Sequence, residues 1–87
     1  MRVLFAMLVT VLLFGPFATV VGSSECTVEL DNDHTCQAIL RRLSDDLPAL
    51  RPLLSGARIA INAKFADPHR DVLESDEVAL IGMVSGG

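Results

Sequence analysis

The 87-residue sequence predicts an α+β fold in which one main helix covers one face of a mixed sheet. Apolar runs at residues 9–14 and 77–84 predict two buried strands, since a strand covered on its faces lacks polar alternation. Between them, residues 25–30 alternate like a half-buried strand and residues 36–46 carry a helical apolar stripe. The first and last strands would pair in parallel. This order is the plan of a β-grasp (ubiquitin-like) domain.

The first strand is expected at residues 9–14, because valine and threonine favour extended backbone and Gly15-Pro16 supplies a stop. The same region also resembles a secretory signal, with a basic second residue, an apolar run over residues 3–14 and small residues near position 22. A membrane span is not expected, since the Gly-Pro pair interrupts the run before the roughly 20 residues that a span requires. We prefer the strand, because the rest of the chain lacks enough strands to close a sheet without it.

The chain is expected to divide into three parts. Residues 1–8 are a leader or extra N-terminal residues, residues 9–84 are the β-grasp domain, and residues 85–87 are a flexible reactive tail. Within the domain, residues 17–24 are expected to form a short connecting turn and loop. In the strand that follows, the apolar side consists of Cys26, Val28 and Leu30.

The main helix is expected from Cys36 to about Asp46, with Thr35 accepting a backbone hydrogen bond as its N-cap. Pro48 ends it. Burial of each leucine on its apolar side contributes roughly 1.5–3 kcal/mol, so this helix is expected to cover the core. The apolar stripe consists of Ile39, Leu40, Leu43 and Leu47.

The remaining elements are shorter. Residues 49–56 are expected to form a turn or short helix, and residues 58–62 a short strand with Ile59 and Ile61 on one face. Residues 63–76 are expected to be a loop-rich crossing that contains an Asp-Pro turn signal. The run at 77–84 is expected to be buried on both faces.

The composition argues against several classes of protein. The formal net charge is −4 and Lys64 is the single lysine, whereas phosphate recognition needs clustered basic residues. Cys26 and Cys36 form no CxxC pair and complete no zinc site; they are small apolar residues in a reducing compartment or one disulfide in a secreted domain. His34 and His69 are isolated, and no serine has a GxSxG context. Neither a metal site nor catalytic side chains are expected.

The unusual feature is the end of the chain, where Ser85-Gly86-Gly87 directly follows an apolar strand. Glycine in a strand is unfavourable by about 0.5–1 kcal/mol, so this tail is expected to leave the sheet and to thread a narrow channel in another protein. It would deliver the α-carboxylate of Gly87, which becomes an acyl donor once activated, for instance as a mixed anhydride with AMP. A thiocarboxylate made from it would be a sulfur nucleophile. The alternative is a frayed glycine-rich end.

Three segments resemble the MoaD family, the small subunit of molybdopterin synthase. Residues 9–30 (VTVLLFGPFATVVGSSECTVEL) are similar to its opening strand with a "VLFFA"-like pattern, and residues 60–62 (Ala-Ile-Asn) are similar to its Val-Asn segment. Residues 75–87 (SDEVALIGMVSGG) resemble its closing "GDEVAxxPPVSGG", which is the most specific part. The family has a β-grasp fold, in agreement with the order of elements above.

The resemblance implies a sulfur carrier. Gly87 would be adenylated by a MoeB-type activating enzyme that uses ATP, and then converted to a thiocarboxylate by a sulfur donor that the sequence does not identify. The tail would enter a large MoaE-type subunit and donate sulfur to cyclic pyranopterin monophosphate, in a cytoplasmic heterotetramer of two carriers and two large subunits. No permanently bound cofactor, nucleic acid or membrane is implied. Partner contacts are expected at Phe14, Val78, Leu80, Gly82, Met83 and Val84.

The sequence departs from the family pattern at two pairs. Gly82-Met83 stands where the family often has Pro-Pro, which would loosen the exit of the tail. Gly15-Pro16 replaces the usual residues after the first strand, so the short helix there would start later or be distorted. Residues 1–6 are not explained by the family.

Three other functions are compatible with the sequence. A related carrier would serve thiamine, cysteine or tRNA thiolation through the same tail chemistry. A ubiquitin-like modifier would join Gly87 to a lysine of a target. A small secreted protein would lose residues 1–22 as a signal peptide and would contain a Cys26–Cys36 disulfide.

Overall fold

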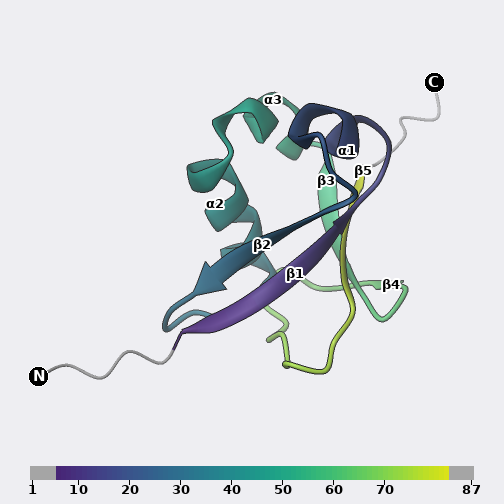
Figure 1. The fold of residues 1–87 in the computed structure, drawn as a ribbon. Helices are drawn as coiled ribbons and strands as arrows, with labels where there is room; N and C mark the ends of the chain where they lie inside the picture. Colours follow the sequence, from purple (N-terminus) through teal and green to yellow (C-terminus); the bar gives the residue numbers. More distant parts are fainter. Residues whose placement is uncertain (1–5, 83–87) are drawn as a thin grey trace, which may run out of the picture.

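Five strands form one mixed sheet in the computed structural model, which describes residues 6–82. Their order across the sheet is β2-β1-β5-β3-β4 (Figure 1). β1 runs antiparallel to β2 and parallel to β5, and β5 runs antiparallel to β3. This is the predicted β-grasp plan. The strands are β1 (Met7–Leu13), β2 (Glu25–Leu30), β3 (Ala57–Ile61), β4 (Lys64–Phe65) and β5 (Val78–Gly82).

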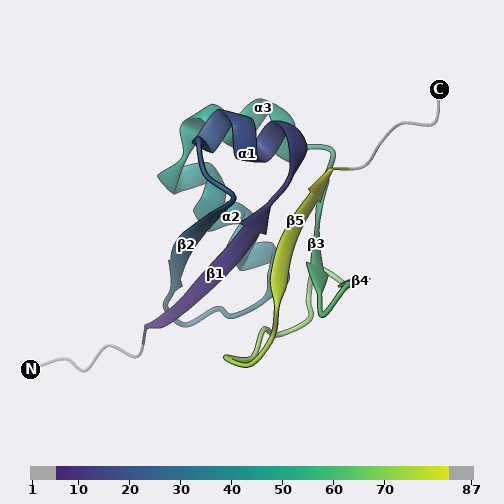
Figure 2. The ribbon, with the colours of Figure 1, turned by 45° about the vertical axis from the view of Figure 1, so that its right-hand side comes forward.

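β1 lies near the centre of the sheet, between β2 and β5 (Figure 2). Val11 is 0% exposed and lies beside Val78 of β5 in the parallel pair, as the apolar run predicts. The strand begins at Met7, two residues before the expected start of the domain, and Met7 pairs with Leu30. Residues 7–13 are therefore used as a strand of the core.

α1 (Gly15–Val21) follows β1 directly, where a turn and loop were expected over residues 17–24. Proline fits the first turn of a helix, because the N–H group that it lacks would have no partner there. The helix ends at Gly22, whose φ of 80° is the left-handed conformation that glycine adopts readily, and whose N–H group donates to the carbonyl oxygen of Ala18 at 2.8 Å. The Gly-Pro pair thus starts a helix rather than delaying or distorting it.

α2 (Cys36–Asp46) covers one face of the sheet, as predicted. Thr35 caps it, since its hydroxyl oxygen accepts a hydrogen bond from the backbone N–H group of Ala38 at 3.2 Å. Ile39 and Leu43 are both 0% exposed and face the inner sides of β1 and β2 in the core. Two short helices follow α2, namely η1 (Pro48–Leu50) and α3 (Arg51–Leu54), where a turn or short helix was expected.

β4 was not predicted from the sequence, because it is only two residues long and lies in a polar stretch. It forms a hairpin with β3 through Asn62 and Ala63, whose φ values of 52° and 69° are those of a tight two-residue turn. The crossing after β4 is tied to the start of α2, since the N–H group of Val72 donates to the carbonyl oxygen of His34 at 2.8 Å.

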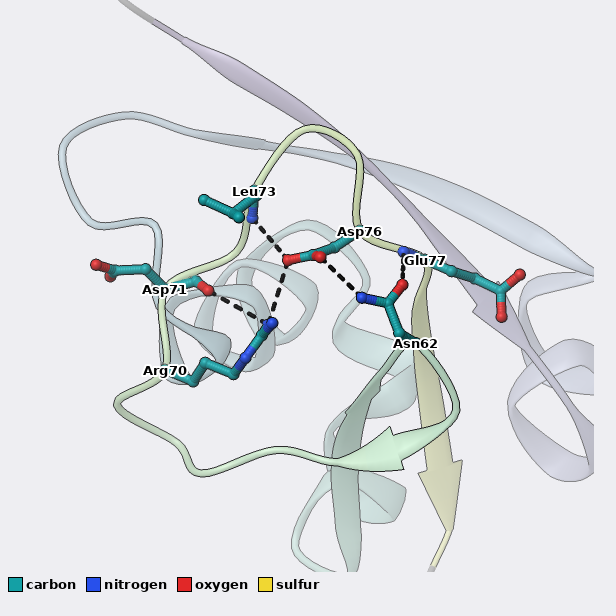
Figure 3. Close-up of polar contacts among 6 residues, drawn as sticks. All are labelled: Asn62, Arg70, Asp71, Leu73, Asp76 and Glu77. Carbon is teal, nitrogen blue, oxygen red and sulfur yellow. Dashed lines mark hydrogen bonds and ion pairs between the residues drawn. The ribbon is translucent and has the colours of Figure 1, made fainter.

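Asp76 ends this crossing and connects it to β5 (Figure 3). Its carboxylate is 6% exposed and accepts hydrogen bonds from the Leu73 N–H group at 2.9 Å, the Asn62 side-chain amide at 2.9 Å and Arg70 at 3.2 Å. The backbone hydrogen bond from Leu73, followed by those from Asn62 and Arg70, lowers the pKa of Asp76. Asn62 also accepts a hydrogen bond from the N–H group of Glu77 at 2.9 Å, so the network fixes the chain where β5 begins.

β5 alternates between the two faces of the sheet, so the prediction that it is buried on both faces is wrong. Val78 and Leu80 are 1% and 0% exposed and point into the core under the helices. Ala79 and Ile81 lie half-buried on the opposite face. Only the inner face is covered by helices, and a strand in that position shows period-two burial.

Candidate functional site at the end of the last strand

The candidate site lies at the end of β5, because β5 is the last described element before the C-terminal glycines of the sequence. Gly82 is the last described residue and pairs with Ala57 at the start of β3. On the other side of β5, Leu80 pairs with Leu13 at the end of β1. β5 is thus held between two strands, and its end lies at the same end of the sheet as α1 and α3 (Figure 2). The predicted tail residues Ser85, Gly86 and Gly87 lie outside the described residues, as do the predicted partner contacts Met83 and Val84.

Gly82 packs closely against an aromatic ring of α1. A Cβ atom at this position would lie 3.2 Å from Cε2 and 3.4 Å from Cζ of Phe17, which is itself 4% exposed. Contacts this short require the ring to shift. Glycine at position 82 therefore allows a close approach of the strand end to α1, which gives the residue a packing role that the comparison with Pro-Pro did not suggest.

An apolar groove of about 560 Å³ opens beside the strand end. Phe14, which lines the groove, is 54% exposed. Among residues 6–82, the only polar side chain in its lining is Ser55, and no ionisable group lines it. The groove can therefore hold apolar groups, and its described lining offers no acid and no base that could activate the Ser55 hydroxyl. It is lined by Phe14, Gly15, Pro16, Phe17, Pro52, Leu53, Ser55, Gly56, Ile81 and Gly82.

The residues that were expected to contact a partner divide into accessible and buried ones. Phe14 and Gly82 both line the groove and are accessible. Val78 and Leu80 are buried in the core, so their side chains cannot reach a partner, and the expectation is corrected to core packing. Ile81, which the sequence reasoning missed, takes their place on the accessible side. Alternation within β5 would have identified Ile81, but an uninterrupted apolar run conceals that alternation.

The accessible surface continues across the open face of the sheet. Arg58 is the cross-strand neighbour of Ile81, and its guanidinium carbon lies 4.7 Å from the ring centroid of Phe65. Phe65 is 51% exposed. Exposed aromatic side chains and arginine are enriched at protein interfaces, and an arginine over an aromatic ring makes a cation–π contact. Phe14, Ile81, Arg58 and Phe65 are therefore the side chains best placed to receive a protein partner near the strand end.

The thiols are poorly suited to sulfur chemistry of their own. Cys26 and Cys36 are free, which does not support the expected alternative of a disulfide. Burial raises the pKa of the Cys26 thiol, with a smaller contribution from Asp46, and burial also raises the pKa of Cys36. A thiol with a raised pKa stays protonated near neutral pH and is a weak nucleophile.

Other kinds of site are also missing from the described part of the chain. Within residues 6–82, no group of three His, Cys, Asp or Glu side chains is arranged to hold a metal ion. None of the helices over the same residues has the length and apolar character to cross a bilayer. The sequence shows His34 as an isolated histidine. Its Nε2 atom lies 2.8 Å from the carbonyl oxygen of Asp31, so the residue holds a turn.

Comparison with solved structures shows what this fold resembles. SAMP1, small archaeal modifier protein 1 of Haloferax volcanii, is 28% identical with a TM-score of 0.76, over 93% of this chain and 100% of that one. The putative molybdopterin converting factor subunit 1 of Pyrococcus furiosus is 16% identical with a TM-score of 0.75, over 88% of this chain and 98% of that one.

A third solved structure contains two proteins. It is the complex of subunits 1 and 2 of molybdopterin-converting factor from Helicobacter pylori 26695, and it matches at 22% identity with a TM-score of 0.64, over 93% of this chain and 100% of the matched one. No curated protein matches the sequence. The model of the ThiS family matches residues 11–87, which include the central strands, the groove and the C-terminal residues. The chain therefore belongs to the ThiS family, and its fold is the ubiquitin-like β-grasp.

Proposed function

We propose that this protein is the sulfur carrier subunit of a molybdopterin synthase and that its reactive group is the C-terminal carboxylate of Gly87. The observation that carries the proposal is that β5 ends at Gly82 beside an accessible apolar groove, five residues before that carboxylate. The described lining of the groove contains no ionisable side chain that could act as a nucleophile or activate the Ser55 hydroxyl. Membership of the ThiS family and the closing SDEVALIGMVSGG pattern both support a carrier.

The proposed chemistry has three steps. The Gly87 carboxylate attacks the α-phosphate of ATP on a MoeB-type adenylating enzyme, which forms the acyl-adenylate and releases pyrophosphate. Reduced sulfur then displaces AMP, so that a C–S bond replaces the acyl C–O bond to phosphate and leaves a thiocarboxylate. The thiocarboxylate sulfur finally forms a C–S bond to a carbon of cyclic pyranopterin monophosphate and displaces an oxygen leaving group from that carbon; water then hydrolyses the resulting thioester, which leaves the sulfur on the pterin and restores the Gly87 carboxylate. This chain needs no permanently bound cofactor for any of these steps.

The partner in the last step would be a MoaE-type large subunit in the cytoplasm. The Helicobacter pylori structure, a complex of subunits 1 and 2, supports a partner of this kind. The surface of Phe14, Ile81, Arg58 and Phe65 would contact the large subunit, while the tail enters its active site. Two carriers and two large subunits would form the heterotetramer, and the catalytic side chains would belong to the large subunit.

A second candidate is a ubiquitin-like modifier, which the similarity to SAMP1 at 28% identity favours. Both functions use the acyl-adenylate of Gly87 and diverge after it. A modifier would transfer the acyl group to a lysine amine and form an amide, whereas a carrier would exchange oxygen for sulfur. Related carriers for thiamine or tRNA thiolation share the thiocarboxylate and differ in the acceptor.

The test is to incubate the full chain with ATP, a MoeB-type enzyme and sulfide, and to measure its intact mass. A carrier gains the mass difference between sulfur and oxygen at the C-terminus. The loaded carrier is then mixed with a MoaE-type subunit and cyclic pyranopterin monophosphate, and molybdopterin formation is measured. Loading without transfer would favour a different thiolation acceptor, and amide-linked adducts without loading would favour the modifier.

A further inference from the structure

The outer edge of β2 is a second feature that the tail chemistry does not use. Among residues 6–82, β2 pairs only with β1 and lies at the end of the sheet (Figure 1). Its register with β1 runs through six consecutive pairs, and its sequence ECTVEL contains no proline. The opposite edge of the sheet is the two-residue strand β4. Natural edge strands are usually shortened, bulged or covered, and β2 is protected only by charge.

The register identifies which backbone groups face outward. The N–H group of Leu13 donates to the carbonyl oxygen of Ser24 directly opposite it, at 2.8 Å. In an antiparallel ladder, pairs joined by backbone hydrogen bonds alternate with pairs that are not. Counting on from Ser24, Cys26 and Val28 therefore also direct their N–H and carbonyl groups to β1. Thr27 and Glu29 then present their N–H and carbonyl groups at the free edge.

The hydrogen bond of Glu25 agrees with this assignment. Its N–H group donates to Oγ of Ser23 at 3.3 Å rather than to β1. The outward-facing residues of β2 therefore alternate with those that bond to β1. The free edge can form main-chain hydrogen bonds to an added strand at two successive positions, which is the basis of β-strand addition in peptide recognition.

A groove of about 270 Å³ lies beside this edge, between the end of β2 and α2. Two arginines in its lining are paired with aspartates, Arg41 with Asp33 at 3.7 Å and Arg42 with Asp46 at 3.1 Å. Three acidic residues of the lining have no ion-pair partner within residues 6–82. These are Glu29, Asp31 and Asp45.

We propose that the free edge of β2 binds an extended, basic segment of another protein as a sixth strand, independently of the tail. The added strand would place apolar side chains on the α2 side, in line with Val28 and Leu30, and basic side chains beside Glu25 and Glu29. A second copy of this chain is disfavoured as the occupant. Antiparallel pairing of two β2 edges would bring glutamates against glutamates, and like charges across a strand pair are destabilising.

The probe is a capped peptide in which valine and lysine alternate, titrated into the full chain labelled with nitrogen-15. We expect amide shifts to change at Thr27, Glu29 and Arg42, while those of Phe14 and Ile81 stay unchanged. A peptide in which valine and glutamate alternate should not bind. Shift changes centred on the Phe14 groove, or equal binding of the acidic peptide, would overturn the proposal.

Two variants make the test specific. Thr27→Pro removes an outward N–H group without removing a bond to β1, and proline is tolerated on edge strands whose N–H group faces solvent. We expect it to weaken binding of the basic peptide roughly three- to tenfold, the effect of one lost hydrogen bond. Thr27→Val keeps the N–H group and should bind like the parent chain. Equal affinity of the proline and valine variants would contradict the proposal.

If Thr27→Pro fails to fold, Glu29→Lys provides a second readout. This substitution replaces a negative charge on the open face of the edge with a positive one. It should weaken binding of the lysine peptide, and it should allow the glutamate peptide to bind, which the parent chain does not. Sedimentation of the parent chain without peptide should show a monomer, with no second copy paired to this edge. A concentration-dependent dimer that Thr27→Pro abolishes would show that a second copy occupies the edge, and would overturn the proposed occupant.

Discussion

The ring of Phe17 lies so close to the backbone of Gly82 that a Cβ atom there would be 3.2 Å from ring carbon Cε2. This contact joins α1 to Gly82, the last described residue of β5. It fixes the end of β5 against α1. The end of β5 is therefore anchored beside the groove.

We expect Gly82→Val to destabilise the fold by about 1–3 kcal/mol, the usual cost of forcing a packed core to make room. Gly82→Ala should be less destabilising than Gly82→Val, because the ring must yield by only a few tenths of an ångström. Urea unfolding measures both. Gly56→Ala is the matched control, since a Cβ atom at that position meets nothing within 4 Å. An unchanged midpoint for Gly82→Val would show that the Phe17 contact is not tight.

Leu80 and Ile81 are neighbours in β5 and should respond differently to truncation. Leu80→Ala should lower the free energy of unfolding by about 2–5 kcal/mol, because a side chain that is 0% exposed leaves a cavity. Ile81→Ala should cost less stability and should weaken binding to a MoaE-type subunit, measured by isothermal calorimetry at a temperature where both variants are folded. If a fully folded Leu80→Ala variant lost binding while Ile81→Ala kept it, the assignment of Leu80 to the core and of Ile81 to the partner surface would be wrong.

Asp76 should make the stability depend on pH in the acid range. Its pKa is lowered in the folded state, so the stabilisation is present above the unfolded value of about 3.9 and is lost as the pH falls through the folded pKa. Asp76→Asn should remove this part of the pH dependence and should lower the melting temperature at pH 7. Asp45→Asn is the control, because Asp45 makes no ion pair within residues 6–82. Parallel pH profiles for Asp76→Asn and the parent chain would contradict the role of the network.

The two thiols should be dispensable for sulfur loading. Burial raises the pKa of Cys26 and Cys36, so alkylation by iodoacetamide at pH 7 should be slow and should accelerate as the pH rises through the raised values. The double variant Cys26→Ala, Cys36→Ala should still acquire sulfur from ATP, sulfide and a MoeB-type enzyme. Loss of loading in a folded double variant would place the sulfur on a cysteine instead of Gly87.

The sequence was sufficient for the centre of the fold because its signals there are strong. β1 and β5 are long apolar runs bounded by breakers, and α2 combines the Thr35 cap with a clear stripe of buried side chains. β4 has two residues and no periodicity to detect. The start of α1 was misplaced, and the residues alone predicted a turn and loop there, because Gly15-Pro16 is compatible both with the end of a strand and with the start of a helix.

The candidate site was predicted only in part for a related reason. Phe14 and Gly82 were identified from their places in the family pattern, and the tail from its composition. The groove itself combines three segments far apart in the sequence, at residues 14–17, 52–56 and 81–82, and their proximity follows from the parallel pairing of β1 with β5. The inward direction of Val78 and Leu80 follows from register, which an uninterrupted apolar run does not reveal.

The central claim is that the protein acts through the carboxylate of its last glycine. The most direct test measures molybdopterin formation from cyclic pyranopterin monophosphate, with a MoeB-type enzyme, a MoaE-type subunit, ATP and sulfide. The parent chain is compared with a chain that lacks Gly87 and with one that carries an extra alanine after it. We predict unchanged folding by circular dichroism and no product from either variant. Product formation by the folded chain without Gly87 would contradict the account.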